Sequence, residues 1–174
     1  MTVGSHEEPV GPAALPLVRL NHVSFQCASV DESVEFYRSA LGFELVKRPA
    51  SLDFRGAWLH MYGMGIHLLQ RGSDFDAPAA ARPPAINPKG NHISFQCTDM
   101  GHVKARLAEM ELEEFVAARV RDSETVVEQL FFHDPDGNVI EICDCEKLPV
   151  IPLGDAGGAG VPSLLVTVPG SVHG

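Results

Sequence analysis

Two histidines lie at equivalent positions of a phrase that the chain contains twice. Residues 21–27 read Asn-His-Val-Ser-Phe-Gln-Cys, and residues 91–97 read Asn-His-Ile-Ser-Phe-Gln-Cys, so six of seven positions agree at an offset of 70 residues. A repeat of this length and fidelity indicates two copies of one structural unit. His22 and His92 therefore occupy the same place in two units, and pairing the units could bring both imidazoles to one centre.

Superposing the two units adds two more polar side chains. His67 in Gly-Ile-His-Leu-Leu-Gln takes the place of Glu141 in Val-Ile-Glu-Ile-Cys-Asp. A single strand histidine is more often a packing residue, but four polar residues at symmetry-related places among apolar neighbours favour a metal site. Three imidazoles and one carboxylate suit Zn²⁺, Ni²⁺, Co²⁺, Fe²⁺ or Mn²⁺. The predicted ligands are His22, His67, His92 and Glu141.

The first unit has the signals of one helix among strands. Alternation over Arg19–Ala28 predicts a half-buried strand. Ser29 followed three residues later by Glu32 is a capping box, which predicts that a helix begins there, and Gly42 marks its end. Further strands are predicted over Phe43–Arg48, Ala57–Tyr62 and Ile66–Gln70, with a hairpin around Gly63-Met64-Gly65.

The second unit repeats this order after a proline-rich segment, residues 71–90, that predicts a linker. Asp99 is the expected cap of its helix. We predict an α+β fold in which two paired βαβββ modules, residues 17–70 and 91–148, form a cleft. Residues 1–16 and 149–174 are expected to be flexible. The predicted strands of this unit are Asn91–Cys97, Phe115–Val120, Gln129–His133 and Val139–Cys143.

Other side chains on the predicted strands extend the candidate cleft. Ser24 and Gln26 alternate in phase with His22, and Ser94 and Gln96 alternate in phase with His92. They could orient a polar substrate, and hydrogen bonding within the sheet is an equally good account of them.

The predicted hairpins also place apolar residues in this cleft. If Tyr62 pairs with Ile66, Leu59 and Met61 share a face with His67. The same count puts Leu130 and Phe132 beside Glu141, which favours an apolar pocket. A slip of one residue would reverse these faces. Trp58 is interpreted as a packing residue and His133 as a turn residue.

Composition and charge exclude several classes of function. A hydrophobic fraction of 45% with 21% charged residues is typical of a soluble globular protein. The net charge of −10 argues against nucleic acid or an anionic membrane as a partner. No apolar run approaches the ~20 residues needed to span a bilayer, and the first residues lack the pattern of a secretory signal. We expect a cytoplasmic protein with a small-molecule substrate.

The four cysteines do not have the pattern of a disulfide-bonded protein. Cys27 and Cys97 recur with the repeat and are interpreted as packing residues in a reducing compartment. Cys143 and Cys145 form a C-x-C without a matching second pair, so a structural zinc site is not predicted.

Three motifs together resemble the vicinal oxygen chelate superfamily over residues 17–150, and within it the plant glyoxalase I-like proteins. They are the doubled Asn-His-[Val/Ile]-Ser, the segment from Glu35 to Phe43, and Asp-Pro-Asp-Gly-Asn-Val-Ile-Glu ending at Glu141. The resemblance implies paired modules around one divalent ion. It also implies a lyase or isomerase that acts on two adjacent substrate oxygens through a metal-stabilised enediolate, with Glu141 as the base.

Three positions depart from the glutathione-dependent members of that family. His67 stands where they usually have glutamate, Gln26 where they tend to have an arginine for a glutathione carboxylate, and Arg71 where they have asparagine. Glutamine cannot make the charge-assisted pair that arginine makes, although Arg71 could partly compensate. The substrate is therefore either the hemithioacetal of methylglyoxal and glutathione, as in lactoylglutathione lyase, or a glutathione-independent specialised metabolite.

Two other functions fit the same fold. An extradiol-type iron dioxygenase needs two histidines and one carboxylate, which His22, His92 and Glu141 could supply, but His67 would then fill an open position. A non-catalytic protein that binds a small molecule is the second alternative. The modules could pair within a monomer or exchange between the chains of a homodimer.

Overall fold

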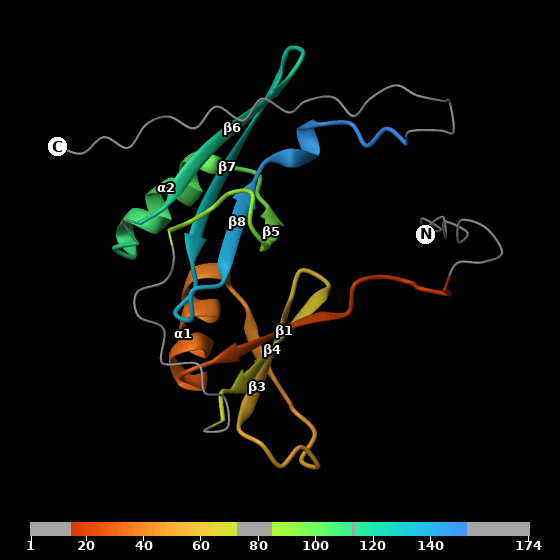
Figure 1. The fold of residues 1–174 in the computed structure, drawn as a ribbon, viewed down its shortest axis with the longest axis vertical. Coiled ribbons are helices and arrows are strands. Elements are labelled where there is room, and N and C mark those ends of the chain that lie inside the picture. The colour runs from red at the N-terminus through yellow and green to blue at the C-terminus, as the bar shows by residue number, and fades with distance from the viewer. Residues whose placement is uncertain (1–14, 73–84, 113, 153–174) are drawn as a thin grey trace.

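A computed structural model describes residues 15–72, 85–112 and 114–152 (Figure 1). The expectations for residues 1–14, for residues 73–84 of the linker and for residues 153–174 lie outside the described residues. The first module contains β1 (His22–Cys27), α1 (Val30–Leu41), β2 (Glu44–Val46), β3 (Gly56–Met61) and β4 (Met64–Gln70).

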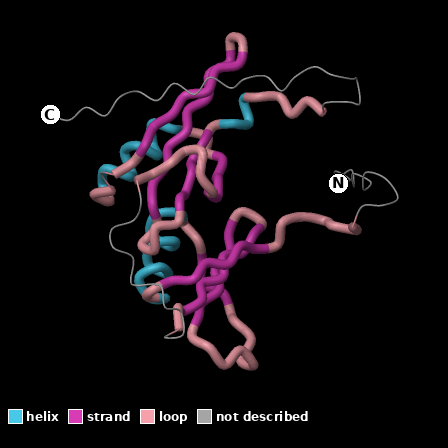
Figure 2. The backbone as a smooth tube through the Cα atoms, in the orientation of Figure 1, coloured by secondary structure: helices cyan, strands magenta, loops and turns pink. Residues whose placement is uncertain are grey.

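The second module has the same order of elements, so the α+β fold of two βαβββ modules is confirmed. Each module forms a four-stranded sheet, in the orders β1-β4-β3-β2 and β5-β8-β7-β6. Figure 2 shows the strands in magenta beside the helices in cyan. In both, the first strand is parallel to the last, and the other pairings are antiparallel. The elements are β5 (His92–Gln96), α2 (Met100–Glu109), β6 (Val116–Asp122), β7 (Thr125–His133) and β8 (Val139–Cys143), followed by a short 3-10 helix, η1 (Cys145–Lys147).

Both helices begin where the sequence predicts, and α1 also ends where it predicts. The Ser29 side chain accepts a hydrogen bond from the Glu32 N–H at 3.3 Å, and Gly42 closes α1 in the left-handed conformation at φ 72°. Asp99 caps α2 by accepting from the His102 N–H at 2.9 Å. Neither helix, among those that the structure describes, is long and apolar enough to cross a membrane.

The two modules share one hydrophobic core on the helix-covered sides of their sheets. The ring centroids of Phe43 and Phe95 lie 5.9 Å apart across the module boundary. The Tyr37 hydroxyl, buried on α1, donates to Asp134 Oδ2 at 2.8 Å in the β7–β8 turn. Because side chains alternate along a strand, the predicted metal ligands lie on the faces that this core does not use.

The register of the β3–β4 hairpin corrects the sequence-based assignment of faces. Tyr62 and Gly63 form a two-residue turn in which both residues have positive φ (54° and 75°), so Met61 pairs with Met64. Trp58 is therefore opposite His67, whereas Leu59 is buried in the core. The prediction that Leu59 and Met61 share the face of His67 was wrong because it assumed a longer turn.

The register of the β7–β8 hairpin also differs from the predicted one. Phe131 pairs with Glu141, so Leu130 and Phe132 face the core rather than the candidate site. His133, interpreted as a turn residue, is the last residue of β7. The face around Glu141 consequently carries Phe131 and the polar Gln129 instead of two apolar side chains.

Candidate metal centre

The first pair of predicted ligands lies on adjacent parallel strands, His22 on β1 and His67 on β4. Their rings stack with centroids 3.9 Å apart and planes 19° apart. Trp58 stacks on His67 with centroids 4.1 Å apart and planes 2° apart. Burial, and then the nearby charge of His22, lower the pKa of His67. His67 is thus held toward the neutral form, which is the form that binds a metal.

Gly65 allows β1 and β4 to bring these two imidazoles together. It pairs with His22, and a Cβ atom placed on it would lie 3.2 Å from the His22 Cβ and 3.7 Å from His67 Nε2. A Cβ at this position would push on His22 and would lie in ordinary contact with His67.

The second pair, His92 on β5 and Glu141 on β8, is in direct contact. His92 Nε2 lies 3.0 Å from Glu141 Oε2, and the glutamate is only 3% exposed. Gln129 Nε2 donates to the other oxygen, Oε1, at 2.5 Å. The Gln129 amide therefore satisfies one carboxylate oxygen and offsets part of the desolvation cost, while the other oxygen faces His92 Nε2.

Both repeat histidines are anchored through the same ring nitrogen. His22 Nδ1 lies 2.7 Å from Asn21 Oδ1, and His92 Nδ1 lies 2.8 Å from the Gly90 carbonyl oxygen. An oxygen acceptor fixes the proton on Nδ1, which leaves the Nε2 lone pair available as a ligand. The repeat thus reproduces a metal-binding tautomer as well as a strand.

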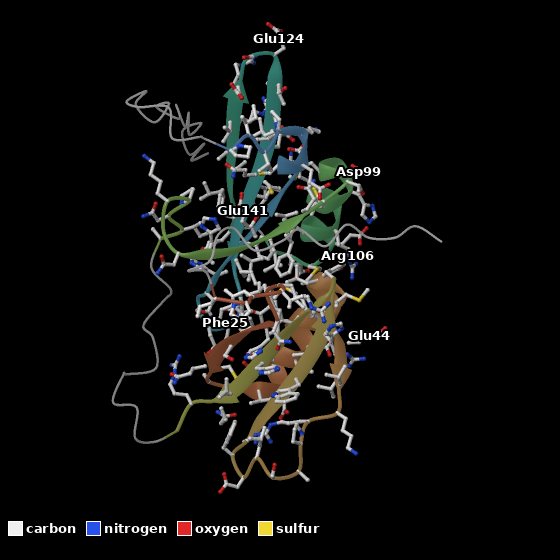
Figure 3. The ribbon with its side chains drawn as sticks, turned by 90° about the vertical axis from the view of Figure 1, so that its right-hand side faces the viewer. Phe25, Glu44, Asp99, Arg106, Glu124 and Glu141 are labelled. Carbon is white, nitrogen blue, oxygen red and sulfur yellow. The ribbon has the colours of Figure 1, made fainter. Side chains whose placement is uncertain are left out.

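Within one chain, no three of the four predicted ligands come within 4.8 Å of one another. The described residues contain no group of three or more His, Cys, Asp or Glu ligand atoms, all within 4.8 Å of one another, that includes members of both pairs. Glu141 and Phe25, a β1 residue, lie in different modules (Figure 3). We call His22 with His67 the imidazole half-site, and His92 with Glu141 the carboxylate half-site. The meeting of all four at one ion remains a prediction.

Two of the predicted substrate-binding residues are exposed, whereas a third is already hydrogen-bonded within the protein. Ser24 and Gln26 are exposed on β1, in phase with His22. Gln96 is already engaged, because its Oε1 accepts from the Glu146 N–H at 3.0 Å and its Nε2 donates to the Cys97 carbonyl at 2.8 Å. Those bonds favour a structural role for Gln96.

The other two predicted substrate-binding residues also make contacts inside their own sheets. Ser94 Oγ is 3.6 Å from Cys143 Sγ. The Arg71 N–H donates to the Cys27 carbonyl at 2.8 Å and extends the β1–β4 ladder by one bond.

Three features of the site were missed by the sequence analysis. Trp58 is a stacking partner of a predicted ligand, and it would have been found from a two-residue β3–β4 turn. Gln129 orients Glu141, and the corrected β7–β8 register places it there. The third is a pair of thiols, Cys143 and Cys145, beside Glu141; burial, with Cys143 and Glu141 nearby, raises the pKa of Cys145 to about 12.

Comparison with known proteins agrees with the resemblance seen in the sequence. The model of the Glyoxalase/Bleomycin resistance protein/Dioxygenase superfamily matches residues 19–142. The chain belongs to this superfamily. It is also 54% identical over 139 residues to Glyoxylase I 4 of Arabidopsis thaliana, covering 80% of this chain and 78% of the relative.

Two solved structures show a similar fold at low identity. The fosfomycin resistance protein FosX from Listeria monocytogenes has a TM-score of 0.57 and 16% identity, with 75% of this chain and 96% of that chain covered. A lactoylglutathione lyase from Agrobacterium tumefaciens has a TM-score of 0.50 and 20% identity, with coverages of 74% and 94%. At these identities the likeness shows the fold alone.

Proposed function

We propose that this member of the superfamily is a metal-dependent lyase of the glyoxalase I type, acting on a substrate with two adjacent oxygens. The observation that carries the proposal is the matched pair of half-sites, in which both repeat histidines present Nε2 beside a second potential ligand. The Arabidopsis relative named Glyoxylase I 4, at 54% identity, supports the same reaction class.

We propose His22, His67, His92 and Glu141 as the metal ligands. Their chemistry fits a borderline divalent ion such as Zn²⁺, Ni²⁺, Co²⁺, Mn²⁺ or Fe²⁺, since neutral imidazoles and a buried carboxylate without a full counter-charge are typical ligands. When bound, such an ion supplies Lewis-acid polarisation of the two substrate oxygens.

Glu141 is the residue to which we assign proton transfer. It is the one carboxylate among the four predicted ligands, and burial within its sheet keeps water from it. Gln129 fixes one carboxylate oxygen, so the other, Oε2, faces His92 and is the oxygen that takes a proton from one substrate carbon and returns it to the next. Phe131, packed edge-on against His92, holds that imidazole in place.

We infer that two copies of the chain complete the site. Each chain uses the helix-covered sides of its sheets for its own core, which leaves both half-sites on the remaining faces. In a dimer, the imidazole half-site of one copy can face the carboxylate half-site of the other.

Exposed apolar side chains before β1 and after η1 support this assembly. The segment before β1 runs away from both sheets (Figure 1) and carries Leu15, Leu17, Val18 and Leu20 at exposures of 61–90%. Val150, after η1, is 97% exposed. A second copy that covers these side chains would remove a large apolar surface from water.

Two classes of substrate, one containing glutathione and one without it, fit this site. The hemithioacetal of methylglyoxal and glutathione is the substrate expected for a lactoylglutathione lyase. Gln26, which is exposed and uncharged, offers no charged partner for a glutathione carboxylate. A glutathione-independent substrate is therefore the alternative for the same site.

Elemental analysis of protein purified without chelator, followed by assay of methylglyoxal with and without glutathione, tests this function. We expect a bound divalent metal and metal-dependent release of S-lactoylglutathione, abolished by chelator and restored by the ion. Turnover of methylglyoxal without glutathione would identify the alternative substrate class. Absence of any turnover across the five metals would contradict the lyase proposal.

The chain also contains its own optical probe of the imidazole half-site. Trp58 is the single tryptophan of the sequence, and it stacks on His67. We expect metal binding to change the Trp58 fluorescence, and the change to disappear in the His67→Gln variant. An unchanged spectrum on stoichiometric metal binding would place the ion elsewhere.

A further inference from the structure

Two cysteine thiols and one carboxylate lie together where β8 ends. Glu141 and Cys143 alternate along β8 and share a face, and the chain then turns through Asp144 so that Cys145 begins η1 beside them. One carboxylate oxygen and the two sulfur atoms all lie within 4.8 Å of one another. Within the described residues, this is the one group of three metal-ligating side chains that meets this distance limit.

The spacing of these atoms is close to that of the ligands of one tetrahedral cation. Zn²⁺ binds sulfur at about 2.3 Å and carboxylate oxygen at about 2.0–2.2 Å, so two ligand atoms at a tetrahedral angle are about 3.6–3.8 Å apart. The three atoms, which lie within 4.8 Å of one another, would need to move together by about 1 Å at most. Glu141 and Cys143 are buried and Cys145 is half-buried, so the group is largely shielded from solvent.

Polar neighbours line the group and can orient it. Ser94 Oγ lies 3.6 Å from Cys143 Sγ, and Gln129 Nε2, which holds Glu141 Oε1, lies 4.0 Å from Cys145 Sγ. Hydrogen-bond donors of this kind around thiolate and carboxylate ligands stabilise metal sites. The other carboxylate oxygen, Oε2, faces His92.

We propose that Glu141, Cys143 and Cys145 form a second cation site, selective for thiophilic divalent ions such as Zn²⁺ and Cd²⁺. It is distinct from the centre proposed for catalysis because two of its three ligands are sulfur and all three come from one chain. Binding replaces the two thiol protons, which are released to solvent, and involves no change of oxidation state.

The shared carboxylate gives the second site a consequence for activity, and this step rests on the proposed function. An ion held by the two sulfurs and Glu141 occupies the group to which we assign proton transfer. We therefore expect Cd²⁺, added to protein whose catalytic centre already holds its metal, to inhibit the enzyme, whereas Mn²⁺, which prefers oxygen and nitrogen ligands, does not. Inhibition should disappear when the thiols are removed.

Cadmium binding to the full-length protein tests the site without relying on activity. Titration of wild-type protein with Cd²⁺ should produce an ultraviolet thiolate-to-metal charge-transfer band, with one thiol-dependent cadmium ion per chain by elemental analysis. The double variant Cys143→Ser/Cys145→Ser should lose both the band and that ion. Cys97→Ser is the matched control, because Cys97 directly follows β5 and lies outside the group, so its variant should keep the band.

A second comparison separates the two proposals. The double variant His22→Ala/His67→Ala should keep the thiolate band, whereas its lyase activity should be lost. A wild-type protein that shows the band but no lyase activity would contradict the proposed function alone. The second site is overturned by a band that survives Cys143→Ser/Cys145→Ser in protein with native circular dichroism, or by cadmium binding to the wild type without a band.

Discussion

The two copies of the repeated phrase end in different surroundings, although six of their seven residues agree. His22 is exposed and stacks on the half-buried His67, which in turn stacks on Trp58, and within the described part of the chain His22 forms no ion pair with a carboxylate. His92 faces a buried carboxylate that Gln129 holds from the other side. The repeat thus reproduces the strand and the anchored imidazole, while the residue on the neighbouring strand decides the chemistry.

The two half-sites therefore have different expected roles, one in metal binding alone and the other in metal binding and proton transfer. The imidazole half-site offers two nitrogen ligands whose lone pairs would be committed to the ion, so neither would be free to take a proton from a substrate carbon. The carboxylate half-site supplies the one anion among the predicted ligands. Changes in the first should therefore act on metal affinity, and changes at Glu141 should act on turnover as well.

Glu141→Gln is expected to have the largest effect. The amide keeps the shape of the side chain and its contact with Gln129 but cannot accept a proton, so kcat should fall about 10²–10⁴-fold. Steady-state kinetics at saturating metal measures it. Glu128→Gln is the control, since Glu128 is paired with Lys104 and Arg119 on the other face of β7 and its loss should leave kcat unchanged. Equal kcat for Glu141→Gln and wild type would rule out Glu141 as the base.

Gly65→Ala should act on the imidazole half-site alone. A methyl group at this position would lie 3.2 Å from the His22 Cβ, which must shift away from His67, so metal affinity should fall about 10–100-fold while kcat at saturating metal changes little. Calorimetric titration with metal, or quenching of Trp58, reports the affinity. Gly63→Asn in the same hairpin is the control, because no atom lies within 4 Å of its Cβ position and asparagine tolerates positive φ. A drop in kcat with unchanged metal affinity would contradict the assignment of the imidazole half-site to metal binding alone.

Asn21→Ala tests the anchoring of the first imidazole. It removes the acceptor of the His22 Nδ1 proton, so the ring can turn and change tautomer, and metal affinity should fall about tenfold. His92 has no equivalent variant, because its anchor is a backbone carbonyl. Metal titration of Asn21→Ala beside Asn21→Asp, which keeps an acceptor, measures the effect. Identical affinities for the two variants would show that the anchor does not matter.

Acid pH should weaken the fold slightly through the same half-site. His67 has a lowered pKa in the folded chain, so the unfolded chain binds the extra proton first. Its contribution is present above the ordinary histidine pKa of about 6.5 and is lost as pH falls through the lowered value. Urea unfolding of metal-free protein between about pH 7.5 and 5 measures the slope, and His67→Gln should flatten it. A steeper slope in His67→Gln would show the sign to be wrong.

The fold could be predicted from the sequence because its signals are local. The doubled phrase indicated two equal modules, and Ser29, Gly42 and Asp99 gave helix ends that the structure confirms. The pairing of His22 with His67 and of His92 with Glu141 followed from superposing the modules, since parallel neighbours must share a face.

The rest depends on contacts that the sequence does not encode locally. A turn with Tyr62 at positive φ cannot be distinguished by pattern from one with Gly63 alone at positive φ, and that single residue reversed the faces of β3. The return of Cys145 toward Glu141 depends on the turn at Asp144. The separation of the two half-sites depends on how the modules pack, with Tyr37 bonded to Asp134 across the boundary.

Mixing two inactive variants tests the central claim most directly, namely that half-sites from two chains complete one centre. His22→Ala/His67→Ala chains lack one half-site, and Glu141→Gln chains lack the other. If the halves come from different copies, an equal mixture after subunit exchange contains hybrid dimers with one intact centre, and activity should recover to about a quarter of wild type. If each centre is built within one chain, the mixture stays as inactive as its components, and the account of a shared site is contradicted.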